Sequence, residues 1–82
     1  MRRKGEINLD RVKWDWPHHV AILADRVMGG GYDIVHGFAD RLSVGPRAYH
    51  TRRDDVDYVV FCFSDPAHAD LFGARFDGER VG

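Results

Sequence analysis

The chain has little of what would place its 82 residues outside the ordinary globular classes. Its single cysteine, Cys62, cannot form a disulfide within the chain, which favours a reducing compartment. It has no apolar run near the ~20 residues of a membrane span. The basic start at residues 1–4 is not followed by the apolar core of a signal peptide. We therefore expect a cytoplasmic protein with no membrane association.

An excess of charge of one sign is also missing. Twelve Lys and Arg oppose 13 Asp and Glu, so the net charge is -1. This balance does not indicate a protein that binds nucleic acid through bulk positive charge. Hydrophobic residues at 44% and charged residues at 30% are typical of a folded domain. A chain this short has no room for a deep cleft between domains, so an enzyme would need a second subunit to build its pocket.

The chain does contain segments of clear periodicity. Short apolar or β-branched runs predict strands at residues 18–24, 47–53, 57–63 and 79–81. Apolar residues at helical spacing predict helices at residues 32–42 and 66–76. Pro66 suits the first position of the second helix, and Gly78 suits a left-handed cap at its end. Asp54 and Asp55 predict a turn that makes the second and third strands a hairpin. Gly37 inside the first helix costs about 1 kcal/mol and suggests close packing on a neighbour.

This element order predicts an α+β domain of the ferredoxin-like βαββαβ class. One antiparallel sheet would carry both helices on one face, with the first and third strands central and the second at an edge. Residues 18–82 would form this domain, and residues 1–17 a basic, tryptophan-containing arm. In the arm, the spacing of Leu9, Val12 and Trp16 allows a helical turn with Asn8 as its cap. An extended arm would instead place Trp14 and Trp16 on one face.

The third strand, DYVVFCF, is apolar on both faces. Its side chains alternate between two sets, Val59, Phe61 and Phe63 on one side and Tyr58, Val60 and Cys62 on the other. One set can pack under the helices. Leaving the other set wet would forgo several kcal/mol in a domain stable by about 5–10 kcal/mol. We therefore expect a cover from the Trp14/Trp16 segment, from a second copy of the chain, or from a different partner.

Residues 57–81, DYVVFCFSDPAHADLFGARFDGERV, resemble the second half of an RNA-recognition-motif domain. In that family too, an aromatic strand runs through a short turn into an Ala/Phe helix and a Gly turn. Tyr58 matches an aromatic stacking position, whereas Val60 stands where the family has another aromatic and Asp57 replaces its glycine. The resemblance implies a shared fold. As an alternative function it implies binding of single-stranded nucleic acid, through residues Arg47, Arg52, Arg53 and Tyr58.

A pattern over most of the chain is similar to a group of small alphaproteobacterial proteins. They share PHHVA, RRDD-x-D-[YF]-VVFCF and P-x-x-A-x-x-F-x-x-RF-x-GER, which are residues 17–21, 52–63 and 66–80 here. The resemblance implies a bacterial or bacteriophage origin and no particular activity.

The reactive side chains do not have the spacing that a catalytic or metal site requires. The five histidines lack metal-ligand spacing, and one cysteine cannot anchor structural zinc. Cys62 lies mid-strand among phenylalanines, which predicts an inert thiol. Residues 29–31 are glycines before a helix but lack the Lys-Ser/Thr of a phosphate-binding loop. The acidic residues at 54–57 are expected to form a solvated turn. We predict no catalytic residue, no metal and no cofactor.

These observations favour a non-enzymatic protein-binding module. It would be an adaptor or inhibitor of the kind that phages and prophages encode, such as an anti-CRISPR protein. The partner would be another protein or a second copy of the chain. The predicted partner-binding residues are Trp14, Trp16, Tyr58 and Val60. A single-stranded nucleic-acid-binding module and a small dimeric enzyme are the alternatives.

Overall fold

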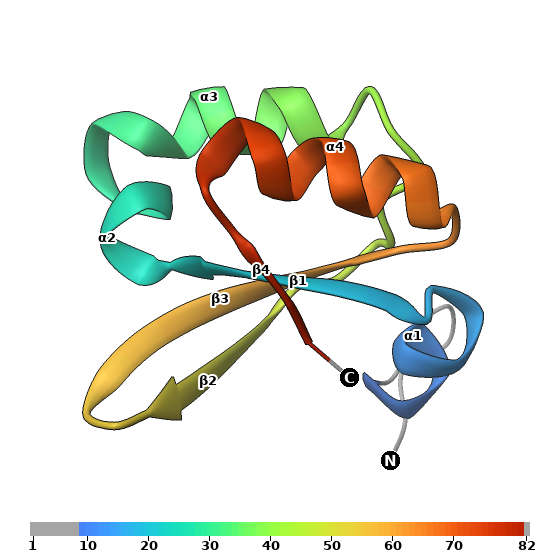
Figure 1. Ribbon diagram of the computed structural model, residues 1–82, viewed down its shortest axis with the longest axis horizontal. Helices are drawn as coiled ribbons and strands as arrows, with labels where there is room; N and C mark the ends of the chain where they lie inside the picture. The colour runs from blue at the N-terminus through green and yellow to red at the C-terminus, as the bar shows by residue number, and fades with distance from the viewer. Residues whose placement is uncertain (1–8, 82) are drawn as a thin grey trace, which may run out of the picture.

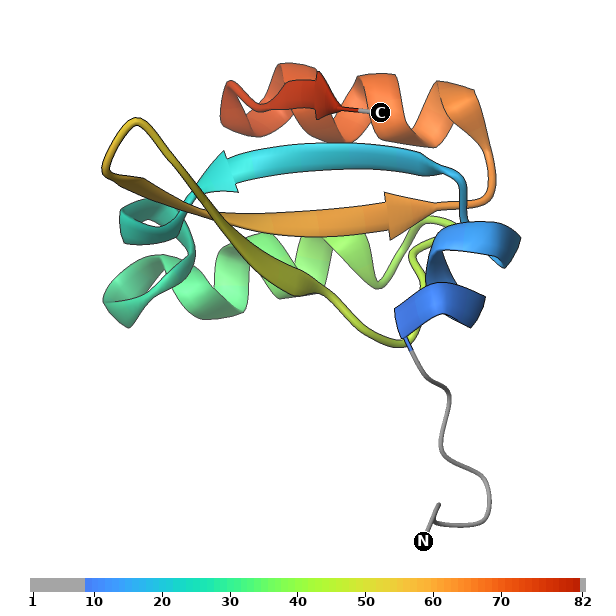
Figure 2. The ribbon, with the colours of Figure 1, turned by 90° about the horizontal axis from the view of Figure 1, so that it is seen from below.

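The computed structural model describes residues 9–81. It contains one open, four-stranded antiparallel sheet in the order β2-β3-β1-β4 (Figures 1 and 2). The strands are β1 (His18–Leu23), β2 (Tyr49–Arg53), β3 (Val56–Phe63) and β4 (Glu79–Val81). The predicted α+β class is therefore confirmed, with the first and third strands central and the second at an edge. The basic residues 1–4 and the predicted cap at Asn8 lie outside the described residues.

Helices flank this sheet on both sides. They are α1 (Leu9–Asp15), α2 (Ala24–Val27), the short 3-10 helix η1 (Gly29–Gly31), α3 (Tyr32–Ala39) and α4 (Pro66–Phe76). Figure 1 shows α3 and α4 together over one face, whereas α1 lies on the other side, beside the start of β1. The helix predicted over residues 32–42 ends at Ala39. It ends early because Arg41 and Leu42 donate to Phe38 and Ala39, three residues back, in tight turns.

The helix-covered face of the sheet holds the main core. Alternate residues of the central strands point into it and meet the buried side of α4, because successive strand residues face opposite ways. The Phe72 ring is at the centre, with centroids 5.0 Å from those of Phe61 and Phe63 and 5.1 Å from that of Phe76. The other buried members are Val20, Ile22, Val27, Val35, Ala39, Val59 and Ala69. This packing fixes which side of β3 remains for the opposite face.

Helix α4 begins and ends through local side-chain chemistry. The Asp65 carboxylate accepts a hydrogen bond of 2.9 Å from the Ala67 amide, and Pro66 follows as the first helical residue. At the other end, Asp77 has a φ of 56° and takes the left-handed position that we had predicted for Gly78. Gly78 serves close approach instead. An added Cβ there would contact Ile22 and lie 2.7 Å from Val20 Cγ1.

The hairpin between β2 and β3 confirms the predicted turn. Arg53 pairs with Val56, so the loop has only two residues. Asp54 and Asp55 both have positive φ, 53° and 66°. This is the geometry of a type I′ turn, whose twist matches that of the flanking strands.

Candidate functional site

The face of the sheet opposite to α3 and α4, which we call the open face, carries the second set of β3 side chains. Strand pairing places Val60 between Ala21 of β1 and Tyr49 of β2. Figure 2 is seen from this side. The residues on the open face are His19, Ala21, Leu23, Tyr49, Thr51, Arg53, Val56, Tyr58, Val60, Cys62, Glu79 and Val81.

Helix α1 covers one end of the open face. Its Val12 is fully buried, and its Lys13 places Nζ 4.8 Å from the centroid of the Tyr49 ring. Burial lowers the pKa of His19 and raises that of Cys62; the charge of Lys13 adds to the first shift and partly offsets the second, so it acts on that end of the face. The segment before β1 thus provides part of the cover that we expected, but Val12 and Lys13 provide it rather than the two tryptophans.

The two tryptophans lie in different surroundings. Residues of a helix are about 100° apart around its axis, so Trp14 points about 200° away from buried Val12 and outward from the sheet. Trp14 is 83% exposed, more than any other large apolar side chain in the described part of the chain. Trp16 is half-buried, and a Cβ added to Gly45 would lie 3.1 Å from its ring. Since the segment is helical, Trp16 holds α1 to the chain and Trp14 remains available to a partner.

A polar pair lies beside α1 on the open face. The Tyr49 hydroxyl and His19 Nδ1 are 3.2 Å apart. His19 is almost fully buried, and its Nε2 has no hydrogen-bond partner among the described residues. Burial lowers the pKa of His19, the backbone carbonyl of Trp16 opposes this, and Lys13 lowers it further. Burial also raises the pKa of Tyr49. At neutral pH His19 is therefore an uncharged member of the covered end.

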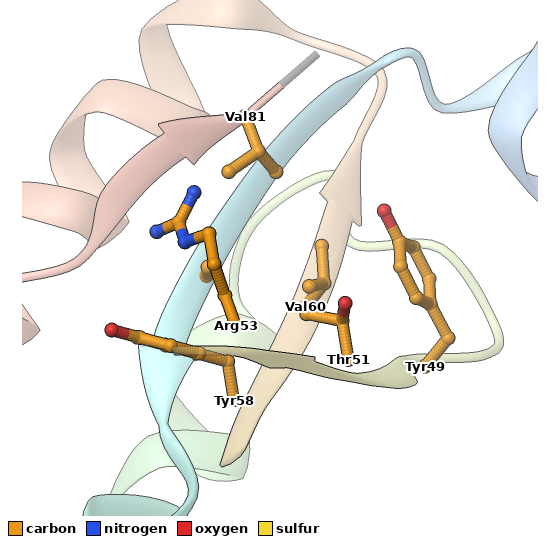
Figure 3. A pocket seen from close by; sticks show the side chains of 7 residues that line it. Tyr49, Thr51, Arg53, Tyr58, Val60 and Val81 are labelled. Atoms are coloured by element: carbon orange, nitrogen blue, oxygen red, sulfur yellow. The ribbon is translucent and has the colours of Figure 1, made fainter. Parts of the chain in front are cut away.

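Beyond Tyr49 the open face forms a hollow of about 210 Å³ that reaches all four strands (Figure 3). Small aliphatic side chains from three strands line it, and Thr51 adds a hydroxyl. In Figure 3, Tyr49 lies on one side of Val60 and Thr51, and Tyr58 on the other. The lining residues are Ala21, Tyr49, Thr51, Arg53, Tyr58, Val60 and Val81. Val60 and Cys62 are buried and Tyr58 is half-buried, so the second set of β3 is covered only in part.

Arg53 forms the charged rim of this hollow. Its guanidinium carbon lies 5.3 Å from the centroid of the Tyr58 ring, and its Nη2 donates to Glu79 Oε1. The hydrogen bond to Glu79 is the main reason that the pKa of Arg53 is raised. A guanidinium has five N–H donors, so this one can bind a further acceptor while it stays paired with Glu79.

The residues predicted for nucleic-acid binding do not converge. Tyr58 and Arg53 lie together on the open face. Arg52 points to the other side of β2, where its Nε is 3.4 Å from Asp57 Oδ1. Arg47 lines a separate hollow beside His36 and Asp40. The described structure therefore joins two of the four residues into one surface.

A cluster that sequence reasoning missed joins Ser43, Asp65 and His68. Ser43 Oγ lies 3.0 Å from His68 Nδ1, and His68 Nε2 lies 3.7 Å from Asp65 Oδ2. These are the residue types of a nucleophilic triad. However, the Ser43 amide donates to the same Nδ1 at 3.0 Å, and Ser43 Oγ accepts from the Asp65 amide. The cluster therefore fastens the loop after α3 to the start of α4. No spacing signal reveals it, because the fold alone brings these residues together.

The other chemical candidates lie in unreactive surroundings. Cys62 is buried, and burial raises its pKa to about 11, so the thiolate is scarce at neutral pH. Within the described residues, no group of three or more His, Cys, Asp or Glu side chains gathers as metal ligands do. Over the same residues, no helix has the length and apolar character needed to cross a membrane.

Comparison with family models, curated proteins and solved structures found no match to the chain. Its function therefore has to follow from the geometry of its own surface.

Proposed function

We propose that the protein is a small non-enzymatic protein-binding module, an adaptor or an inhibitor, whose partner docks on the open face. The observation that carries this proposal is the uncovered hollow across all four strands, together with the exposed Trp14 on helix α1, whose Lys13 lies over Tyr49 of the hollow. Helix α1 covers one end of the face and leaves the hollow uncovered, with the buried Val60 among the residues that line it.

The residue types on this surface support protein binding. Tyr, Trp and Arg are enriched among the residues that dominate binding energy, and they work best around a pocket that loses its water. Tyr49, Tyr58 and Arg53 line the hollow, and Trp14 stands on the neighbouring helix. Leu23 and Val56, each 38% exposed, extend the apolar surface past Tyr58.

We further propose that the architecture is ferredoxin-like. The strand order β2-β3-β1-β4, with β1 and β3 central, supports this assignment. The position of α3 and α4 on one face supports it as well. In that arrangement the helix-free face is the natural place for a binding surface.

Binding of single-stranded nucleic acid is the competing hypothesis, because Tyr58 and Arg53 lie side by side. A base would need an aromatic ring face on which to stack. Both tyrosine rings already carry a cation, Lys13 at 4.8 Å from Tyr49 and Arg53 at 5.3 Å from Tyr58. With Arg47 and Arg52 directed elsewhere, this contact pattern favours a protein partner.

Site-specific photo-crosslinking in a bacterial host tests the proposal. A benzophenone side chain replaces Thr51 in the hollow, and in the control it replaces Ala74, which is exposed on α4. We expect Thr51 alone to yield a defined adduct whose mass identifies its partner. The purified partner should then bind the wild-type chain at least about 10-fold more tightly than the Thr51→Arg variant.

Two results would contradict this proposal. Equal adducts from the two positions would place binding elsewhere or make it nonspecific. Oligonucleotide binding that falls steeply with salt and disappears in Arg53→Ala would establish the nucleic-acid function instead.

A further inference from the structure

We propose that the open face pairs with the open face of a second copy of the chain, with Trp14 of each copy seated in the hollow of the other. This inference rests on the proposed function, because it names one occupant for the same surface. It begins from two features of the same chain, Trp14 and the hollow, and Trp14 is not among the residues that line the hollow. Trp14 is a large apolar side chain that is 83% exposed, and the hollow is a mainly apolar recess of the open face.

The shape of the open face suits pairing with itself. Helix α1 stands on one end of this face as a ridge, and the hollow lies next to it beyond Tyr49 (Figures 2 and 3). Trp14 points away from the sheet and so forms the crest of the ridge. A two-fold axis that runs parallel to the face, between ridge and hollow, brings each ridge over the hollow of the other copy. Most homodimers have such symmetry, in which the same patch serves both copies.

The hollow also has the size and the polar groups that an indole needs. A cavity of about 150 Å³ holds benzene, so a nine-atom indole ring needs about 225 Å³ by simple proportion. The hollow measures about 210 Å³. The Thr51 hydroxyl within it can accept the indole N–H, which usually finds a partner when buried. The Arg53 guanidinium at its rim can stack on the ring.

Charge favours a neutral anchor of this kind. The rim cation Arg53 is paired with Glu79, so the two together add no net charge to the rim, although the guanidinium keeps further N–H donors. The whole chain carries a net charge of only -1, so two copies repel each other weakly. A tryptophan can enter the hollow without breaking the Arg53–Glu79 ion pair.

The area of the face sets the expected strength. The four strands have 6, 5, 8 and 3 residues, so at about 3.3 Å per residue and about 4.8 Å per strand the sheet gives roughly 350 Å² for each copy. Burial of Trp14 adds about 150–250 Å² for each copy, so the pair reaches about the ~1,000 Å² at which specific interfaces begin. An interface this small is typical of a weak, reversible association, so we expect the dimer to form between about 1 µM and about 1 mM.

Sedimentation equilibrium from about 1 µM to about 1 mM tests the dimer directly. The wild-type chain should show a monomer–dimer equilibrium, and its tryptophan emission should move to shorter wavelength as the dimer forms. Trp14→Ala removes both anchors of a symmetric dimer and should weaken association at least about 100-fold. The matched control is Leu71→Ala on α4, 52% exposed in the wild-type chain, which should dimerise as the wild type does.

A mixing experiment tests the exchange of anchors itself. Thr51→Arg blocks the hollow but keeps Trp14, whereas Trp14→Ala keeps the hollow but lacks the anchor. Neither variant should dimerise alone. A mixture should form a heterodimer, because one Trp14 can still enter one intact hollow. Native mass spectrometry separates the two chains by mass and counts this species.

Three results overturn the inference: a wild-type chain that stays monomeric at 1 mM, a Trp14→Ala variant that dimerises normally, or a mixture without heterodimer. None of these decides the proposed function, which the crosslinking from Thr51 tests separately. If the chain is monomeric but still crosslinks another protein from Thr51, the proposed binding function stands. The other protein, rather than a second copy of the chain, then occupies the hollow.

Discussion

The two faces of the sheet are built by the same strands and differ in the groups that surround their aromatic side chains. On the helix-covered face, phenylalanine rings contact one another, as Phe72 does with Phe61, Phe63 and Phe76. On the open face, each tyrosine has a polar neighbour. Tyr49 lies beside His19 and Lys13, and Tyr58 lies beside Arg53.

This difference separates a surface made for folding from one made for contact. Buried rings that pack mainly on one another gain most when water is excluded completely, even though Phe61 also contacts His36 and Phe76 contacts Arg75. Rings with a hydroxyl and a cation tolerate water on one side and can still lose it to a partner. Although β3 is apolar on both faces, only its helix-covered face therefore needs to be a full hydrophobic core.

The most direct test of this difference is to truncate one aromatic residue on each face. Phe72→Ala should cost about 3–5 kcal/mol, because a fully buried ring leaves a cavity. Tyr58→Ala, at a half-buried position, should cost about 1 kcal/mol. Urea denaturation followed by circular dichroism measures both. Similar losses would mean that the open face is a second core and would remove the reason to expect a partner there.

Adding a methyl group tests the same contrast with a smaller effect. At Gly78 an added Cβ would overlap Ile22 and lie 2.7 Å from Val20 Cγ1, two residues of the covered face. Gly78→Ala should therefore cost about 1–3 kcal/mol through overpacking. The control is Gly37→Ala, where the added Cβ meets nothing within 4 Å.

Gly37→Ala should stabilise the protein by about 0.5–1 kcal/mol, because alanine is the better helix former. The close packing that we had inferred from Gly37 was wrong, since its side of α3 is open. Thermal unfolding of Gly78→Ala and Gly37→Ala measures both changes in stability. A loss of stability in Gly37→Ala would show a contact on that side of the helix.

Much of the fold could be predicted because its signals are local. Alternation along β3, Pro66 at the start of α4 and the turn at Asp54 are each signals that span only a few residues of the sequence. The elements that prediction missed lack such a signal. Helix α2 has only four residues, and it begins directly where β1 ends. Helix α3 ends early because residues 40–42 form turns, although their sequence continues the apolar spacing of the helix.

The candidate site was harder to predict, because long-range contacts assemble it. Tyr58 and Val60 could be assigned to one face from alternation alone. Tyr49 could not be paired with His19, 30 residues away, before the strand register was known. The roles of Trp14 and Trp16 depended on whether their segment was helical or extended, and its sequence period supports neither clearly. Because the segment is helical, Trp14 is exposed and the Trp16 ring lies against Gly45.

The pH dependence of stability sharpens the contrast, because the open face buries a titratable group. The pKa of His19 lies below its ordinary value of 6.5. The unfolded chain therefore binds its proton first as the pH falls. The stabilisation from neutral His19 is complete above pH 6.5 and is lost as the pH falls through 6.5 toward the folded-state pKa.

We therefore expect the free energy of unfolding to fall between pH 7.5 and pH 5, and to fall less in His19→Gln. Urea titrations at several pH values measure both slopes, with His50→Gln, at an exposed position of β2, as control. A steeper fall in His19→Gln than in the wild type would contradict the assignment.

The smallest effect concerns the turn that joins the edge strand β2 to β3. Asp55 adopts a φ of 66°, a left-handed conformation that costs an L-residue energy and that glycine adopts freely. Type I′ turns prefer glycine at this second position. Asp55→Gly should therefore stabilise the hairpin by about 0.5 kcal/mol, seen as a small rise in the midpoint of thermal unfolding. Asp57→Gly is the control, because it lies within β3 and pairs with Arg52, so it should destabilise. If both substitutions destabilise equally, the turn is not of this type, and the register that assigns Tyr58 and Thr51 to one face would need revision.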